Sequence, residues 1–121
     1  FQDLSVAEGS ERRPLHEKVA LKAQEWNTRG NVGLVMGATY PEQLKIVRQL
    51  CPDMVILAPG VGAQEGVLGN TVRWGVNASA EGLIINSSRG IIFTSKDKDD
   101  YANEARRAAQ ELRQNINRAR E

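Results

Sequence analysis

The chain has 121 residues, enough for one domain at most, and a domain of this size buries roughly two-thirds of the surface that its unfolded chain exposes. Sixteen Lys and Arg residues against fifteen Asp and Glu residues leave a formal net charge of +1, so no overall field attracts nucleic acid or a membrane surface. No apolar stretch approaches the ~18 residues that span a bilayer, and the first residues lack a basic or apolar targeting segment. We therefore expect a cytoplasmic protein with neither a membrane nor a nucleic acid as partner.

The single cysteine, Cys51, excludes a framework of intramolecular disulfides and is typical of a reducing compartment. It continues an apolar helical pattern and precedes Pro52, so we expect a buried and inert thiol rather than a nucleophile. We expect no metal site.

The first segment, residues 5–13, is polar and contains a Gly-Ser pair and four charged residues, which favours a solvated loop. Pro14 then suits the first turn of a helix that ends near Gly30. His16 falls on the exposed side of this helix as a surface residue. The apolar stripe of the helix has three- and four-residue spacing and consists of Leu15, Val19, Ala23 and Trp26.

Short apolar runs alternate with helical patterns in the middle of the chain. Residues 32–37, 54–58 and 82–86 are predicted strands. The first is a nearly continuous apolar run, which suits a strand covered on both faces, as in parallel sheets. A helix that opens at residues 39–41 and a short helix over 67–74 connect the strands. The buried side of the first of these two helices is marked by Leu44, Val47 and Leu50.

The last predicted helix starts within residues 97–100, where acidic side chains complement the positive end of the helix dipole. We interpret the alternating Lys and Asp residues at 96–100 as a solvated helix start rather than a catalytic cluster. The apolar face of this helix consists of Tyr101, Ala105, Ala108, Leu112, Ile116 and Ala119.

Three strands with intervening helices, and no signal for an antiparallel hairpin, predict parallel α/β architecture. An open doubly wound sheet and part of a closed barrel both remain compatible with this order. A barrel carries its functional loops after the carboxyl ends of its strands, and both unusual loops of this chain directly follow strands.

These two loops carry the candidate phosphate site. In the first, at residues 60–66, Gly60 and Gly62 let a backbone approach a ligand, and the Gln64 amide donates without adding charge. In the second, a turn at residues 87–90, the hydroxyls of two serines precede Arg89, whose guanidinium matches a phosphate bidentately. Each feature also has an ordinary structural interpretation: the glycines as turn residues, Asn86 as a cap, and Arg89 as a surface ion-pair partner.

Three segments resemble bacterial orotidine 5'-monophosphate decarboxylases: residues 33–44 (GLVMGATYPEQL), 53–64 (DMVILAPGVGAQ) and 82–90 (GLIINSSRG). The resemblance covers nearly the whole chain. It implies that residues 1–121 are one partial (βα)₈-barrel domain, the carboxy-terminal half with about strands six to eight and their helices, and that residues 1–4 follow the fifth strand.

The resemblance also implies an activity and a set of site residues. The reaction is that of a carbon–carbon lyase, the decarboxylation of orotidine 5'-monophosphate to uridine 5'-monophosphate (UMP) without a cofactor, in pyrimidine biosynthesis. Gln64, Ser88 and Arg89 contact the substrate phosphate. The phosphate loop that closes over the ligand includes Pro59, Gly60, Val61, Gly62 and Ala63.

The family's Lys/Asp catalytic motif, Asp-x-Lys-x-x-Asp on an early strand, occurs nowhere in this chain. We therefore expect no catalytic residue here and no activity from the isolated chain without the missing amino-terminal half. Family members are typically homodimers, which makes a homodimer the expected assembly. The alternative is a non-catalytic half-barrel that binds a phosphorylated ligand or associates through its unpaired strand edges.

Overall fold

The structure is a computed structural model and describes residues 3–61 and 65–121. Its centre is a parallel sheet in the order β3 (Leu34–Val35), β4 (Ile56–Pro59) and β5 (Leu83–Asn86). Leu34 pairs with Ile56, which in turn pairs with Leu83. The predicted parallel α/β architecture is confirmed, although each strand is shorter than the apolar run that predicted it.

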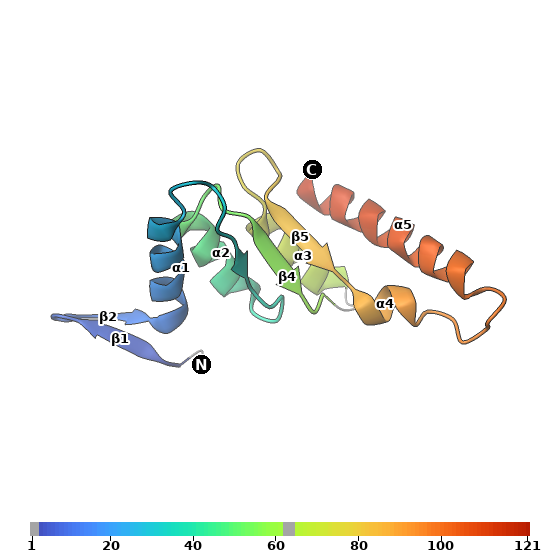
Figure 1. Cartoon of the computed structure of the whole chain (residues 1–121), viewed down its shortest axis with the longest axis horizontal. Coiled ribbons are helices and arrows are strands. Elements are labelled where there is room, and N and C mark those ends of the chain that lie inside the picture. Colours follow the sequence, from blue (N-terminus) through green and yellow to red (C-terminus); the bar gives the residue numbers. More distant parts are fainter. Residues whose placement is uncertain (1–2, 62–64) are drawn as a thin grey trace.

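The helices cover one face of this sheet, as Figure 1 shows for α3 behind β5. Pro41 stands at the start of α2, where its missing amide hydrogen costs nothing, as the sequence predicted. α3 packs against both α2 and α5, and α5 also packs against α4. The helices are α1 (Leu15–Trp26), α2 (Pro41–Leu50), α3 (Glu65–Gly75), α4 (Ser88–Ile92) and α5 (Tyr101–Arg120). None of them, in the part of the chain that is described, is long and apolar enough to span a membrane.

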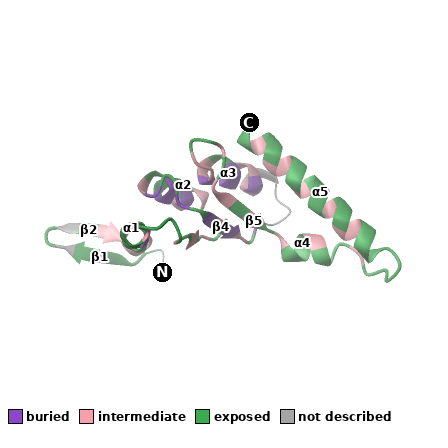
Figure 2. Ribbon diagram, turned by 45° about the horizontal axis from the view of Figure 1, so that its top comes forward, coloured by how far each residue is buried: buried purple, intermediate pink, exposed green. Residues whose placement is uncertain are grey.

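The core lies between this helical layer and the sheet, and Figure 2 shows its buried residues on α2, α3 and β4. The first cluster joins α1 and α2 to β4 and contains Cys51, which is fully buried as predicted. The second joins α3 and α5 to the ends of the strands. The residues at its centre are Ala38, Val61, Leu68 and Val72.

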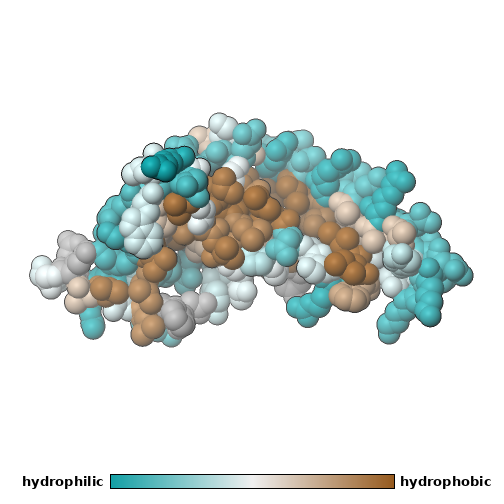
Figure 3. Space-filling view, viewed as in Figure 1, coloured by the Kyte–Doolittle hydropathy of each residue, from teal (hydrophilic) through white to brown (hydrophobic). Residues whose placement is uncertain are grey.

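The other face of the sheet is open, which corrects the prediction that the first strand is covered on both faces. Val35 is 68% exposed and Ile84 is 54% exposed, whereas Ile56, on the helical side, is fully buried. Hydrophobic residues gather over β3, β4 and β5 on the face seen in Figure 3. Exposed apolar surface of this kind marks a site of interaction rather than an ordinary solvated face.

The prediction of a loop at residues 5–13 was wrong. β1 (Ser5–Glu8) and β2 (Glu11–Pro14) form an antiparallel hairpin in which Glu8 pairs with Glu11. Gly9, with φ of +62°, occupies the first of the two turn positions, where type II′ hairpins require glycine. The Gly-Ser pair was therefore a hairpin signal, and it was hidden by the polar strands around it.

The first helix also departs from its prediction. α1 ends at Trp26 rather than near Gly30, because the Asn27 side chain accepts a hydrogen bond from the Val32 amide at 2.8 Å and turns the chain. Trp26 is 65% exposed, with the Lys22 ammonium 5.9 Å from its ring centroid. His16 is not a surface residue: both of its ring nitrogens are shielded from solvent and make no hydrogen bond with residues 3–61 or 65–121.

Arg48, on α2, is 7% exposed and forms a hub of hydrogen bonds that the sequence did not reveal. Its Nε donates to the Gly75 carbonyl at 2.8 Å, and its Nη2 donates to the Gly82 carbonyl at 3.0 Å. Nη1 donates to the Met54 carbonyl at 2.6 Å and to two further carbonyls just after α2. Burial lowers the pKa of this guanidinium, against the opposing charges of Cys51 and Asp53. These carbonyls precede β4 and β5, so the hub joins the helices to the amino ends of the strands.

Candidate functional site

The candidate site lies at the opposite end of the sheet, where β4 and β5 finish side by side. Pro59, the last residue of β4, pairs with Asn86, the last residue of β5. The two loops that follow, beginning at Gly60 and Ser87, therefore start next to each other. Parallel pairing thus brings together the two segments that the sequence singled out.

A cavity of about 530 Å³ lies between these loop segments. Four of the predicted site residues, Gly60, Val61, Ser88 and Arg89, line it together. Pro59 is half-buried at the end of β4, directly before them. The remaining lining residues are Asn86, Ser87 and Gly90. The predicted Gly62, Ala63 and Gln64 lie outside the described residues.

Arg89 gives this cavity its charge. It is exposed on the first turn of α4 and pairs with no carboxylate in residues 3–61 and 65–121. The other lining side chains are neutral, so the cavity combines one guanidinium with hydroxyl and amide groups. Such a set suits an anion that accepts several hydrogen bonds, because a guanidinium donates through a planar fork.

Two glycines keep the backbone of the cavity in its observed form. Gly60 has φ of +80°, a left-handed conformation that disfavours any residue with a side chain. At Gly90 a Cβ would stand 2.7 Å from the Ser87 Oγ, so a larger residue there would displace the serine hydroxyl from its observed position. The sequence predicted a plain turn at residues 87–90, but the structure begins α4 within it, at Ser88.

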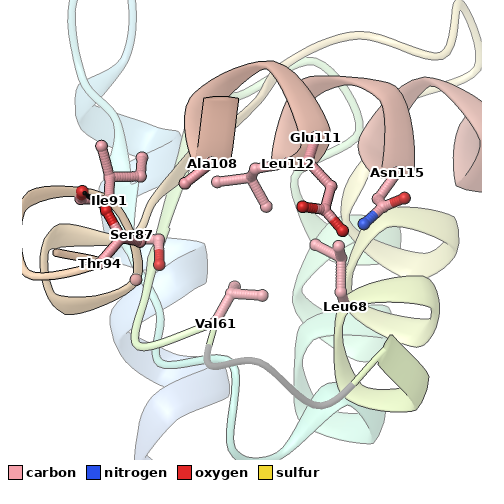
Figure 4. Close-up of a pocket in the computed structure, with 10 residues that line it drawn as sticks. Val61, Leu68, Ser87, Ile91, Thr94, Ala108, Glu111, Leu112 and Asn115 are labelled. Atoms are coloured by element: carbon pink, nitrogen blue, oxygen red, sulfur yellow. Dashed lines mark hydrogen bonds between the residues drawn. The ribbon is translucent and has the colours of Figure 1, made fainter. Parts of the chain in front are cut away.

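A second cavity, of about 270 Å³, lies on the other side of Ser87, between α3, α4 and α5. In Figure 4 the Val61 and Leu68 side chains approach it from one side, and Leu112 and Glu111 approach it from α5. Its single charged lining residue is Glu111, a carboxylate, which repels anions. Between the two cavities, the one with Arg89 is therefore the better anion site.

The other candidates contribute little to the site. Residues 96–100 are all exposed, and the Asp97 carbonyl accepts from the Tyr101 amide at 3.0 Å, which supports a solvated helix start there. Tyr101 itself is exposed, so the apolar face of α5 begins later than predicted. Within the described ranges, no group of three or more His, Cys, Asp or Glu side chains could hold a metal ion.

No protein-family model matches the chain, but individual proteins match it closely. An orotidine 5'-phosphate decarboxylase from Cellvibrio japonicus is 49% identical over 121 residues, which cover 99% of this chain and 42% of that protein. The chain resembles the carboxy-terminal part of an orotidine 5'-phosphate decarboxylase. A second decarboxylase of that name, from Roseiflexus castenholzii, is 49% identical over 98% of this chain and 43% of its own length.

Solved structures give the same result for the fold. The Leishmania donovani OMP decarboxylase superposes with a TM-score of 0.78 at 40% identity, over 98% of this chain and 42% of that one. The Leishmania donovani UMP synthase superposes with a TM-score of 0.79 at 42% identity, over 98% of this chain and 24% of that one. The predicted fold, part of a (βα)₈ barrel, is confirmed. The chain spans about two-fifths of the length of the decarboxylases that it matches.

Two lining residues, Asn86 and Gly90, were absent from the predicted site, whereas the Ser87 hydroxyl was part of it. Ser87 and Gly90 belong to the turn that the sequence singled out, but their mutual contact depends on a backbone shape that no pattern encodes. Asn86 was interpreted as a cap. Its position as the last residue of a strand, directly before the polar turn, was the available signal.

Proposed function

We propose that this chain supplies the phosphate-binding part of an orotidine 5'-monophosphate decarboxylase. The observation that carries the proposal is the convergence of Gly60, Ser88 and Arg89 on one cavity at the carboxyl ends of β4 and β5. Phosphate sites in (βα)₈ barrels are frequently built from the loops after the last two strands. The decarboxylase relatives at 49% identity support orotidine 5'-monophosphate as the phosphorylated ligand and UMP as the product.

In the proposed mechanism this chain acts by binding and does not touch the reacting carbon. Arg89 donates hydrogen bonds to phosphate oxygens, Ser88 adds its hydroxyl and backbone amide, and Gln64 donates its amide from the first loop. Interactions with a remote, non-reacting group can hold the substrate in the geometry that the transition state requires. Binding of the phosphate thereby raises the rate of a reaction that leaves the phosphate unchanged.

Decarboxylation itself needs residues that this chain lacks. The Lys/Asp motif expected from the resemblance is absent from the sequence, so an amino-terminal portion must supply it and cover the open face of the sheet. No cofactor is part of the proposal. A homodimer of complete barrels in the cytoplasm is the assembly we propose, and sedimentation of the complete protein tests its stoichiometry.

The decisive experiment measures orotidine 5'-monophosphate decarboxylation by the complete protein, meaning this chain together with its amino-terminal portion. Arg89→Ala should lower kcat/KM by roughly 10- to 150-fold, because hydrogen bonds to charged groups contribute about 1.5–3 kcal/mol. Arg106→Ala, on the exposed side of α5, is the matched control and should leave kcat/KM unchanged. A folded complete protein without decarboxylase activity would refute the proposal.

A non-catalytic half-barrel is the second candidate, and the open apolar face favours it because such a face also drives self-association. Calorimetry with UMP tests the phosphate site that both candidates share. Binding that disappears in Arg89→Ala supports the phosphate site in either protein. Decarboxylation by the complete protein then excludes the non-catalytic candidate.

A further inference from the structure

Asn86 is a polar residue on the open face of the sheet, where its neighbours are apolar. Along β5, Leu83 and Ile85 pack into the helical side of the core. Successive side chains of a strand alternate between its faces, so Asn86 shares the open face with Ile84. The Asn86 carboxamide therefore stands at the carboxyl end of a surface that is otherwise hydrophobic.

Asn86 lines the phosphate cavity from the end of β5, whereas the charged residue of the cavity, Arg89, lies on α4. Asn86 lines the same cavity as Gly60 and Arg89 and pairs in register with Pro59. Its side chain makes no hydrogen bond to any of the described residues. Arg89 follows on the first turn of α4, beyond the end of the strand, whereas Asn86 is still part of the sheet. A ligand whose phosphate lies at Arg89 and whose remainder extends over the open face would pass Asn86.

The chemistry of the carboxamide decides which part of the ligand it recognises. It carries two donors and one acceptor, so unlike the guanidinium of Arg89, which only donates, it can both donate to and accept from a ligand. Sugar hydroxyls and pyrimidine carbonyls are neutral groups that donate or accept single hydrogen bonds, and a carboxamide complements them. An unpartnered amide on the open apolar face of β5, before the helix that carries Arg89, therefore fits the nucleoside that extends over this face.

We propose that Asn86 binds the nucleoside portion of the nucleotide and thereby selects a nucleotide over a bare phosphate. This inference rests on the proposed function, since it takes the cavity at Arg89 as the phosphate site. Asn86 is a positioning residue in this role, because it holds the nucleoside, which links the bound phosphate to the reacting group.

The test compares three probes, inorganic phosphate, ribose 5-phosphate and UMP, by calorimetry on the complete protein. Asn86→Ala should weaken UMP by roughly three- to tenfold, the range expected for one neutral hydrogen bond, and leave inorganic phosphate unchanged. Arg89→Ala should weaken all three probes. Ribose 5-phosphate distinguishes the two parts of the nucleoside: a loss equal to that of UMP assigns the hydrogen bond to the ribose, and no loss assigns it to the base.

Asn117→Ala, an exposed asparagine of α5, is the matched control and should change none of the affinities. UMP binding that Asn86→Ala leaves unchanged, or an equal loss for UMP and inorganic phosphate, overturns the inference while the proposed function stands. Failure of the wild-type protein to bind UMP would overturn both. Circular dichroism of each variant checks the folding of the complete protein.

Discussion

Arg48 shows how a single side chain can organise one end of this fold. Its guanidinium donates to five carbonyl oxygens from the segments that follow α2, end α3 and precede β5. A buried carbonyl without a partner costs free energy. The Gly82 and Cys51 carbonyls also accept backbone amides, so the carbonyls of Gly75 and Met54 depend most on Arg48. The Arg48 hydrogen bonds thus stabilise the fold at the amino ends of the strands, and the candidate site lies at their carboxyl ends.

Arg48→Met should lower the free energy of unfolding by about 3 kcal/mol, since it removes all five hydrogen bonds and leaves the Gly75 and Met54 carbonyls without the donor shown here. Arg48→Lys should recover only part of the loss, because one ammonium has three donors and no fork. Urea denaturation measures both variants. Arg106→Met, exposed on α5, serves as the control and should stay within about 0.5 kcal/mol of wild type. A loss below about 1 kcal/mol for Arg48→Met would contradict this role of the hub.

Cys51 predicts a pH dependence of stability. Burial raises the pKa of its thiol above the ordinary 9.0, although the nearby Arg48 charge opposes the shift. Above that ordinary value the unfolded chain ionises its thiol while the folded chain keeps it protonated, so the unfolded state is favoured. The free energy of unfolding should therefore fall as pH rises above the ordinary thiol pKa. Denaturation across this range should show a shallower fall for Cys51→Ala, and equal slopes would contradict the prediction.

At the scale of elements, the sequence predicted the regular parts of the chain better than its edges. The short apolar runs and the helix after Pro41 were predicted because their patterns repeat within one element. The hairpin of β1 and β2 was missed because its strands are polar, and α1 ends early because an Asn27 side chain captures the Val32 amide. Such outcomes depend on tertiary contacts that a one-dimensional pattern does not contain.

For the candidate site, the sequence predicted which loops form it but not how their side chains are arranged. The two loops could be identified because glycine, serine and arginine after strands are visible in the sequence. The division of the region into two cavities by Ser87, and the position of Asn86 on the open face, required the register of β4 and β5.

The contact of α3 with its neighbours depends on Gly75. A Cβ at Gly75 would stand 2.9 Å from both δ carbons of Leu83 and 3.1 Å from a δ carbon of Leu44. Gly75→Ala should therefore destabilise the protein by about 1–2 kcal/mol, since overpacking outweighs the gain in helix propensity. Gly69→Ala lies in the same helix, and within 4 Å of the added Cβ there is no atom of the described residues apart from its chain neighbours and the helix's own backbone, so it should stabilise the protein by up to about 1 kcal/mol. Thermal unfolding of the two variants checks the opposite signs, and stabilisation by both would contradict the close packing.

At the scale of the whole molecule, the two faces of the sheet differ, because helices pack on one and the other is exposed. Helices cover one face of the sheet, and a continuous apolar surface that includes Val35 and Ile84 covers the other. β3 and β5 each have one unpaired edge among the described strands, and such edges pair readily with further strands. The same surface should therefore drive two processes, completion of the barrel by an amino-terminal portion and association of the chain with itself.

Val35→Lys separates these two processes from the folding of the helical layer. A charge on the open face cannot be buried without a partner, so Val35→Lys should reduce self-association of the isolated chain and prevent its assembly with the amino-terminal portion. Ile46→Lys, at a partly exposed site on α2, is the control and should affect neither. Sedimentation of the isolated chain and decarboxylation by the assembled protein are the two measurements. If Val35→Lys assembled and turned over substrate like wild type, the open face would not be the surface that the rest of the protein covers.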